Sequence, residues 1–124
     1  MRWIYHIIPQ VTWERLGPGP YRADSLASEG FIHCSHEEQV ARVANLFYAD
    51  QEQLLLLCID AQRLRSPVRD EDIGTGERFP HVYGPIEREA IQEVRRLERG
   101  PNRRWVFPTP PASSSGSGPS QSKL

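Results

Sequence analysis

The sequence predicts an α+β fold in which several short strands surround one main helix. Residues 3–8 alternate side chains in the manner of a strand, whereas residues 54–59 form an unbroken apolar run. Residues 35–48 instead place apolar side chains at the spacing of one helix face. Strands repeat every two residues and helices every 3.6. The three segments therefore predict strands and one amphipathic helix in the same core.

Length and composition fit a single soluble globular domain. The chain has 124 residues, of which 38% are hydrophobic and 25% charged, which is enough for one core. We expect one domain over residues 1–107. Residues 108–124 are rich in Pro, Ser and Gly with almost no apolar side chains, and are expected to be a disordered tail.

Charge and cysteine content narrow the function classes. A net charge of −1 gives no reason to expect nucleic-acid binding. The arginines within residues 95–104 are interleaved with Glu93 and Glu98, as on a solvated surface. Cys34 and Cys58 lie in apolar runs, which fits buried, reduced thiols. Neither a signal peptide nor a bilayer-spanning segment is recognisable, so the expected location is the cytoplasm.

The first third of the chain is expected to form two strands and two helical turns. Residues 3–8 end at Pro9, and their alternation puts Tyr5 and His6 on opposite faces. Residues 13–16 form a turn that Gly17 to Pro20 ends. Residues 25–28, capped by Asp24 and closed by Gly30, form another. Residues 31–34 are the second strand.

The main helix is expected to begin directly after Ser35 and to run to about Tyr48. Ser35 and Glu38 have the S-x-x-E spacing of a capping box, in which the serine caps the helix. Four apolar side chains then recur at i, i+3, i+4 and i+7 and form one buried stripe. They are Val40, Val43, Ala44 and Phe47.

The remaining segments are expected to be mostly strands. Residues 54–59 read as a central strand buried on both faces, and residues 68–71 as a short strand. Residues 79–85 alternate again, but Pro80 favours an edge or irregular strand. Residues 87–97 fit either a helix or a turn followed by a strand, and residues 104–107 form a last strand.

Three of the four histidines lie in these strands beside aromatic residues, namely His6, His33 and His81. Convergence of the three on one cleft would make a site for binding or acid–base chemistry. A structural, hydrogen-bonded role is equally open for each of them. Among the carboxylates, Glu71 at the end of a short strand is the candidate, against the commoner role of a solvated loop glutamate.

The residue spacings weigh the alternative chemistries differently. A metal site is disfavoured, because no H-x-H or H-E-x-x-H spacing and no cysteine pair occurs. Nucleophilic catalysis by Ser35 or Cys34 is weak, because Ser35 serves as a cap and no G-x-S-x-G turn surrounds it. An anion or nucleotide pocket is favoured by the helix start after Ser35, although Glu37 and Glu38 would compete with an anion there.

Aromatic residues near the histidines are candidates for stacking on a base, with core packing as the alternative role. These candidate ligand-binding residues are Tyr5, Tyr21, Phe31 and Tyr83, to which the pocket at the helix start adds Ser35.

Two motifs, Gly30-Phe31-Ile32-His33-x-Ser35 and Phe79-Pro80-His81-x-Tyr83-Gly84, occur here in this order and separation. With them, the chain resembles the small bacterial proteins of domain-of-unknown-function family 952 from about Trp3 to Phe107. The other matching segments are 5–6, 25–26, 39–40, 45–48, 54–60 and 69–71.

That resemblance implies an ADP-ribosyltransferase-like fold with mixed, split sheets and an NAD-binding cleft between them. It also implies a turn at residues 87–90 and a strand at 92–97. His6 corresponds to the first-strand histidine that holds the NAD ribose in the His-Tyr-Glu class of such transferases. No late-strand catalytic glutamate is identifiable, and Glu71 comes too early in the chain for a direct match.

The leading hypothesis is a domain that binds NAD or a related nucleotide and transfers an ADP-ribosyl or phosphoryl group. His6 would hold a ribose hydroxyl, His33 and His81 would contact phosphate or act as general acid and base, and Glu71 would stabilise charge or orient a nucleophile. No cofactor is certain, and NAD enters as a candidate substrate. The rival hypothesis is a non-catalytic small-molecule or partner-binding domain that keeps the fold, with a metal-dependent hydrolase third.

Overall fold

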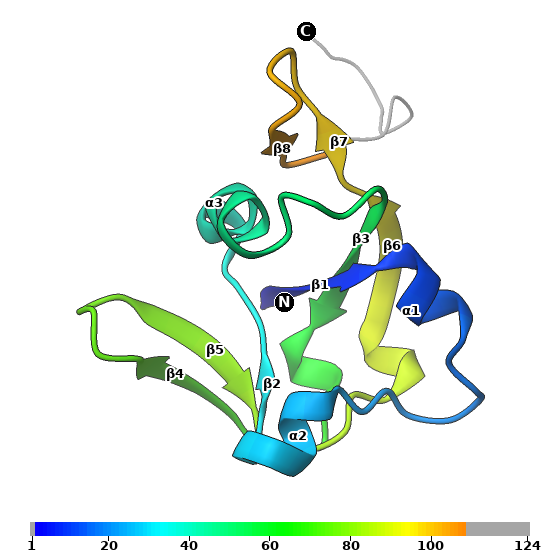
Figure 1. Cartoon of the computed structure of the whole chain (residues 1–124). Helices are drawn as coiled ribbons and strands as arrows, with labels where there is room; N and C mark the ends of the chain where they lie inside the picture. The colour runs from blue at the N-terminus through cyan, green and yellow to red at the C-terminus, as the bar shows by residue number, and fades with distance from the viewer. Residues whose placement is uncertain (1, 109–124) are drawn as a thin grey trace, which may run out of the picture.

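A computed structural model describes residues 2–108 and contains two three-stranded antiparallel sheets and a short hairpin (Figure 1). The first sheet has the order β1-β3-β6, the second β2-β5-β4, and β7 pairs with β8. The elements in chain order are β1 Trp3–Pro9, α1 Gln10–Glu14, α2 Asp24–Glu29, β2 Ile32–His33, α3 Glu37–Phe47, β3 Leu54–Asp60, η1 Ala61–Arg63, β4 Val68–Asp72, β5 Arg78–Val82, η2 Arg88–Ala90, β6 Ile91–Arg96, β7 Glu98–Arg99 and β8 Trp105–Val106.

The central strand β3 carries two cores, one on each face of the first sheet. All seven of its residues are buried, as expected for an apolar run without alternation. On β1, Ile4 and Ile8 face one core and Tyr5 and Ile7 the other. This confirms the alternation expected from the sequence.

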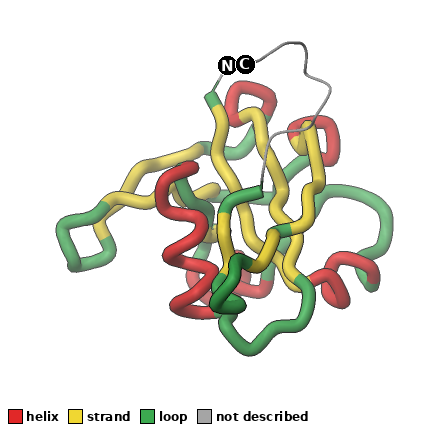
Figure 2. Tube along the Cα trace, turned by 90° about the horizontal axis from the view of Figure 1, so that it is seen from above, coloured by secondary structure: helices red, strands yellow, loops and turns green. Residues whose placement is uncertain are grey.

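Helix α3 covers the core that contains Tyr5 and lies beside the first sheet in both views (Figures 1 and 2). Val40 and Ala44 are fully buried there, but Phe47, expected on the same stripe, is 70% exposed. Phe47 ends the helix and lies at the cavity described below. The opposite core lies between the first sheet and the second, which contributes Ile32 and Val82.

The chain passes from the second sheet to the first through Cys34 and Ser35. The Cys34 N–H donates to the Pro80 carbonyl at 3.0 Å, whereas Ser35 pairs with Tyr5 through both backbone groups, at 2.7 and 2.9 Å. This pairing keeps Ser35 extended, so the prediction that it caps α3 is wrong. The N-cap is His36, and the side chain of Gln39 accepts a hydrogen bond from the His36 N–H at 2.8 Å.

Pro80 does not mark an edge strand, because β5 is the centre of the second sheet. Strand β2 ends at His33, one residue before the position that faces Pro80. The missing N–H of the proline therefore falls opposite Cys34, one residue beyond the end of β2, where only the hydrogen bond from the Cys34 N–H to the Pro80 carbonyl remains.

The structure confirms some of the other expected elements and contradicts others. Residues 87–97 form η2 and β6, so the turn followed by a strand is confirmed and the helix is wrong. Gly30 closes α2 with φ 92°, but the N-cap of α2 is Ala23 and not Asp24. Every strand pair within residues 2–108 is antiparallel, where a mixed sheet was expected. The tail expected from the sequence lies, beyond Pro108, outside the residues that the structure describes.

Two features bear on the class of protein. None of the helices within residues 2–108 is long and apolar enough to cross a membrane. The fold is α+β, with antiparallel sheets and few helices.

Candidate functional site

A cavity of about 640 Å³ lies beside both sheets and contains all three strand histidines in its lining. Its walls come from β1, the segment before α2, the β2–α3 link, the end of α3 and β5. The volume is in the range of small-molecule sites. The structure thus brings together His6, His33 and His81, which the sequence singled out.

His6 is buried at the inner wall, and both of its ring nitrogens have partners. Nδ1 donates to the backbone carbonyl of His33 at 2.6 Å, which leaves Nε2 to accept from the Tyr21 hydroxyl at 2.9 Å. Burial lowers the pKa of His6 to about 4, against the His33 hydrogen bond, which raises it. The imidazole is therefore neutral at pH 7 and serves to orient Tyr21.

Tyr21 carries the polar atom of this pair that remains available. Its ring is buried and its backbone pairs with Ile86, at 2.8 and 2.9 Å, so the side chain has a fixed position. Burial raises the pKa of the Tyr21 hydroxyl, which stays protonated. Since the O–H points to His6, the oxygen can accept a hydrogen bond from a ligand in the cavity.

His81 is held from the other side by Glu71. Its Nδ1 donates to Oε1 of Glu71 at 2.8 Å, and the same oxygen accepts from the Tyr83 hydroxyl at 2.5 Å. The hydrogen bonds from Tyr83 and His81 lower the pKa of Glu71, so the carboxylate stays ionised. When the imidazole of His81 is neutral, this partner leaves its lone pair on Nε2.

The second nitrogen of His81 has no hydrogen-bond partner in the described part of the chain. Nε2 is buried, and within residues 2–108 it forms no hydrogen bond, although the residue itself is only 2% exposed. Buried polar atoms are rarely left in this state. An orphaned nitrogen on a residue that lines a cavity calls for an explanation, which a water molecule or a ligand atom would provide.

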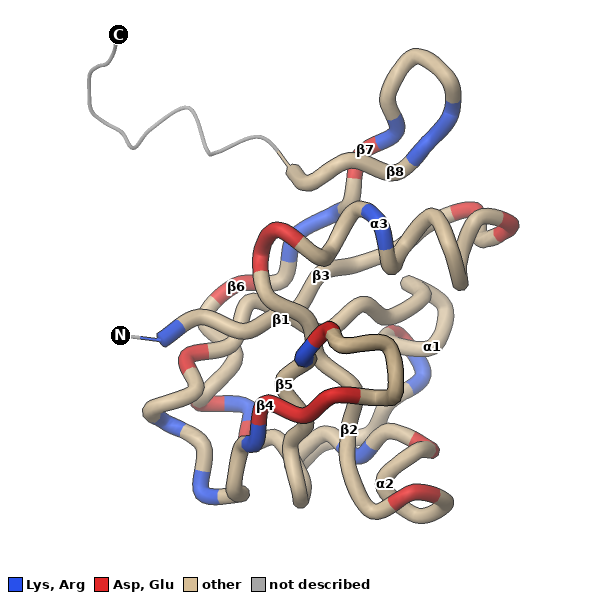
Figure 3. Tube along the Cα trace, turned by 90° about the vertical axis from the view of Figure 1, so that its left-hand side faces the viewer, with Lys and Arg blue, Asp and Glu red and all other residues tan. Residues whose placement is uncertain are grey.

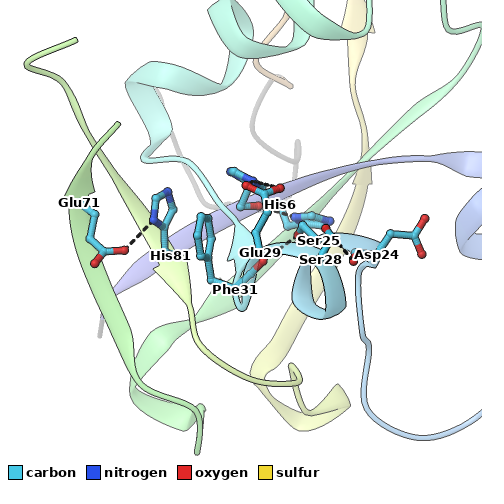
Figure 4. Close-up of polar contacts among 9 residues, drawn as sticks. His6, Asp24, Ser25, Ser28, Glu29, Phe31, Glu71 and His81 are labelled. Carbon is cyan, nitrogen blue, oxygen red and sulfur yellow. Dashed lines mark hydrogen bonds and ion pairs between the residues drawn. The ribbon is translucent and has the colours of Figure 1, made fainter. Parts of the chain in front are cut away.

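Phe31 and His33 surround the same imidazole. Phe31 stacks on His81, with ring centroids 4.0 Å apart and planes 17° apart, and Figure 4 shows His81 between Glu71 and Phe31. The ring of His33 lies 5.4 Å from that of His81, nearly perpendicular to it. His33 is exposed, and its Nε2 lies 3.2 Å from Glu29 Oε2.

Not every candidate residue reaches the cavity. Ser35 lines it, but Tyr5 lies in the opposite core against Phe107, and Glu71 and Tyr83 lie behind His81. Sequence reasoning missed Glu29 as the partner of His33. It offered no signal, because the two residues lie on either side of a helix end that Gly30 creates.

The charges around the cavity differ in sign. Arg22 lines it and forms no ion pair within residues 2–108, whereas Asp24 also lines it. Figure 3 shows the acidic run of β4 as a continuous red stretch on the outer strand of the second sheet. No group of three or more His, Cys, Asp or Glu side chains in the described part of the chain is placed to hold a metal ion.

Comparisons with known proteins found one family model and a few similar solved structures. A family model described as protein of unknown function (DUF952) matches residues 7–94. The chain is similar to the crystal structure of protein CC0527 from Caulobacter crescentus, with a TM-score of 0.74, 26% identity, and coverage of 85% of this chain and 94% of that chain. The solution NMR structure of CC0527 is similar with a TM-score of 0.70 and 26% identity, and the match covers 84% of this chain and 91% of that chain. No curated protein matches the chain.

Proposed function

The chain belongs to the DUF952 family of proteins of unknown function, and we propose that its histidine-lined cavity binds NAD or a related nucleotide. The observation that carries the proposal is the convergence of His6, His33 and His81 on one cavity of about 640 Å³. Apolar walls with a few fixed polar atoms are the usual construction of such a site.

Kinship with the ADP-ribosyltransferase-like fold is part of the proposal. Two features support it: the two separate sheets beside the cavity, and the position of His6 on the first strand. In this structure His6 acts through its neighbour, since both of its ring nitrogens already have partners. Tyr21, fixed by His6, then takes the role of contacting a ribose hydroxyl.

The rest of the cavity offers contacts to the other parts of a nucleotide. Phe47, Tyr48 and Phe79 form an aromatic part of the lining on which a base can stack. Arg22, which has no carboxylate partner among the described residues, provides a cation for a phosphate. With these contacts, transfer of an ADP-ribosyl or phosphoryl group is the chemistry proposed for the bound ligand.

A non-catalytic binding domain is the second candidate, and one observation favours it. Glu71, the glutamate singled out in the sequence, contacts His81 and Tyr83 and does not line the cavity. In that function the same cavity binds its ligand without a reaction, and Glu71 only orients His81.

Binding is tested by titrating NAD, ADP-ribose and ATP into the full chain by calorimetry. Tyr21→Phe removes one hydrogen-bonding oxygen from the cavity and is expected to weaken binding about tenfold. Tyr5→Phe is the matched control, because Tyr5 lies on the opposite face of β1, and it should leave the affinity unchanged. A folded protein that binds none of the three at millimolar concentration overturns the proposal.

A further inference from the structure

His33 and His81 come from adjacent strands and lie directly opposite each other. The register of β2 and β5 pairs His33 with His81, and their rings are 5.4 Å apart with planes at 76°. Both residues line the cavity. Each ring also has its own carboxylate, Glu29 for His33 and Glu71 for His81.

The two carboxylates leave the two rings with different free nitrogens. Glu71 accepts from Nδ1 of His81 at 2.8 Å, so Nε2 carries the lone pair of a base. Glu29 lies 3.2 and 3.3 Å from Nε2 of His33, so Nδ1 is the nitrogen left without a carboxylate. When His33 is protonated, Nδ1–H can serve as an acid while Glu29 retains Nε2–H.

The surroundings of the two rings also differ. His81 is 2% exposed, is stacked on Phe31, and has a buried Nε2 without a partner among the described residues. His33 is half exposed at its side chain. A base sheltered from solvent and an acid in exchange with it are suited to one reaction cycle.

We infer that His81 and His33 form an acid–base pair that hydrolyses a phosphodiester of the bound nucleotide, with Glu71 positioning His81. This inference rests on the nucleotide-binding function proposed above. It selects phosphoryl over ADP-ribosyl transfer because of the leaving group. Nicotinamide leaves a ribose as a neutral molecule and needs no acid, whereas an alcohol leaving from phosphorus needs a proton. A site that holds both a base and an acid therefore fits phosphoryl transfer.

The proposed step balances without a further reactant. Nε2 of His81 takes a proton from a water molecule as the water oxygen forms a bond to phosphorus. The bond from phosphorus to the leaving alkoxy oxygen breaks, its electron pair stays on that oxygen, and Nδ1 of His33 gives the oxygen a proton. The products are a nucleoside monophosphate and an alcohol. The proton that His81 takes up equals the one that His33 gives away, so the net proton count of the pair is unchanged over the step.

Two synthetic esters of thymidine 5′-monophosphate test the pair, one with methanol and one with p-nitrophenol as the leaving group. Methoxide needs an acid and p-nitrophenolate hardly does. His33→Ala should therefore slow hydrolysis of the methyl ester about 100-fold or more and that of the nitrophenyl ester less than tenfold. His81→Asn should slow both about 100-fold. His36→Asn, a histidine change outside the cavity that keeps a good N-cap residue, should slow neither.

The positioning role of Glu71 has its own measurement. Glu71→Gln should lower kcat for both esters and shift the acidic limb of the pH–rate profile, with little change in KM. A merely structural role would leave that limb in place. Because Glu71 is partly exposed, this variant is expected to fold even if substitution of the buried His81 does not.

Chemical-shift changes of the cavity residues on adding the esters separate the two proposals. If the folded protein binds the esters but phosphorus NMR detects no hydrolysis product, the acid–base pair is wrong and the binding function stands. Equal effects of His33→Ala on both esters also overturn the pair. If neither the esters nor ADP-ribose binds, the proposed function falls, and the inference with it.

Discussion

At the scale of single residues, His6 is the side chain whose environment differs most from the one expected. The family resemblance implied that His6 contacts a ribose, but both of its ring nitrogens have partners within the protein. Burial lowers its pKa to about 4. The burial that holds this ring against Tyr21 therefore makes the fold sensitive to acid.

This sensitivity gives a pH prediction for stability. In the unfolded chain an imidazole titrates near 6.5, above the native value of about 4, so the unfolded state binds the proton first. The stability is complete above about pH 6.5 and falls as the pH falls toward 4. The loss is expected to reach about 2 kcal/mol between pH 7 and pH 5. Urea unfolding at the two pH values measures it.

His6→Asn should remove most of this loss, because the amide can still donate to the His33 carbonyl but does not titrate. His33→Asn, at an exposed ring beside it, should keep the loss. The pKa values of Glu71 and Asp72 are also lowered in the fold, from ordinary values of 4.5 and 3.8. These carboxyl groups therefore lose their contribution to stability mainly below pH 5, outside the range that is compared. An NMR titration of His6 with a midpoint near 6.5 would contradict the prediction.

Which residues could be predicted from the sequence depends on whether their partners are local. The convergence of the histidines was expected because each lay in a strand beside aromatic residues. The pairing of Glu71 with His81 was not derivable, since it requires that β4 and β5 be neighbours in one register. The contact of Tyr21 with His6 likewise depends on how the segment before α2 folds back over β1.

At the scale of elements, the turn after β5 requires a glycine for a steric reason that the sequence does not show. Gly84 lies where an added Cβ would come within 2.3 Å of Oγ and 2.9 Å of Cβ of Ser66. The Ser66 hydroxyl donates to the Pro85 carbonyl at 2.8 Å, so this side chain is not free to move aside. The glycine thus allows the segment before β4 to approach the end of β5.

Gly84→Ala is expected to destabilise the protein by about 1–3 kcal/mol, the usual cost of forcing extra atoms into a packed site. Ser66→Gly removes the obstructing atoms, so the double variant should recover part of the loss relative to the two single changes. Denaturant unfolding of the four proteins measures the coupling. Gly17→Ala, with nothing near the added Cβ, is the control and should cost less. Additive losses from the two single changes would rule out the contact.

The predictions of elements were wrong where pairing between distant strands outweighed a local sequence preference. Ser35 has the spacing of a helix cap, but its backbone completes the pairing with β1, so α3 begins later. Pro80 signals an edge, yet β5 is central, because the missing N–H falls one residue beyond the end of β2. In both cases the local preference is worth about 1 kcal/mol, which the contacts between strands can outweigh.

At the scale of the whole molecule, the two cores share one sheet. Cys34 lies in the core between the sheets and Cys58 in the core beneath α3, and both are free thiols. Residues of β1 and β3 contribute to both cores, in alternation. The α+β class follows from the apolar patterns, whereas the division into two sheets depends on pairings between distant strands, which periodicity does not encode.

The two thiols test whether the cores open together. Burial raises the pKa of Cys34 to about 12 and that of Cys58 to about 11, so the native thiols are nearly all protonated at pH 8. Opening one core would expose the sheet on which the other depends. Cys34 lines the cavity but is only 4% exposed, so we expect each thiol to react with a disulfide reagent only through global unfolding, at rates orders of magnitude below those in urea.

Cys34→Ser and Cys58→Ser leave one reporter each, and each rate is compared with the unfolding free energy of the same variant. If the opening free energy of each thiol equals the free energy of unfolding and has the same urea dependence, the two cores form one cooperative unit. If the thiol of Cys34 reacts through an opening that costs much less, the cavity-side core opens alone. The second sheet would then move relative to the first, and the spacing of His6 and His81 would vary with it.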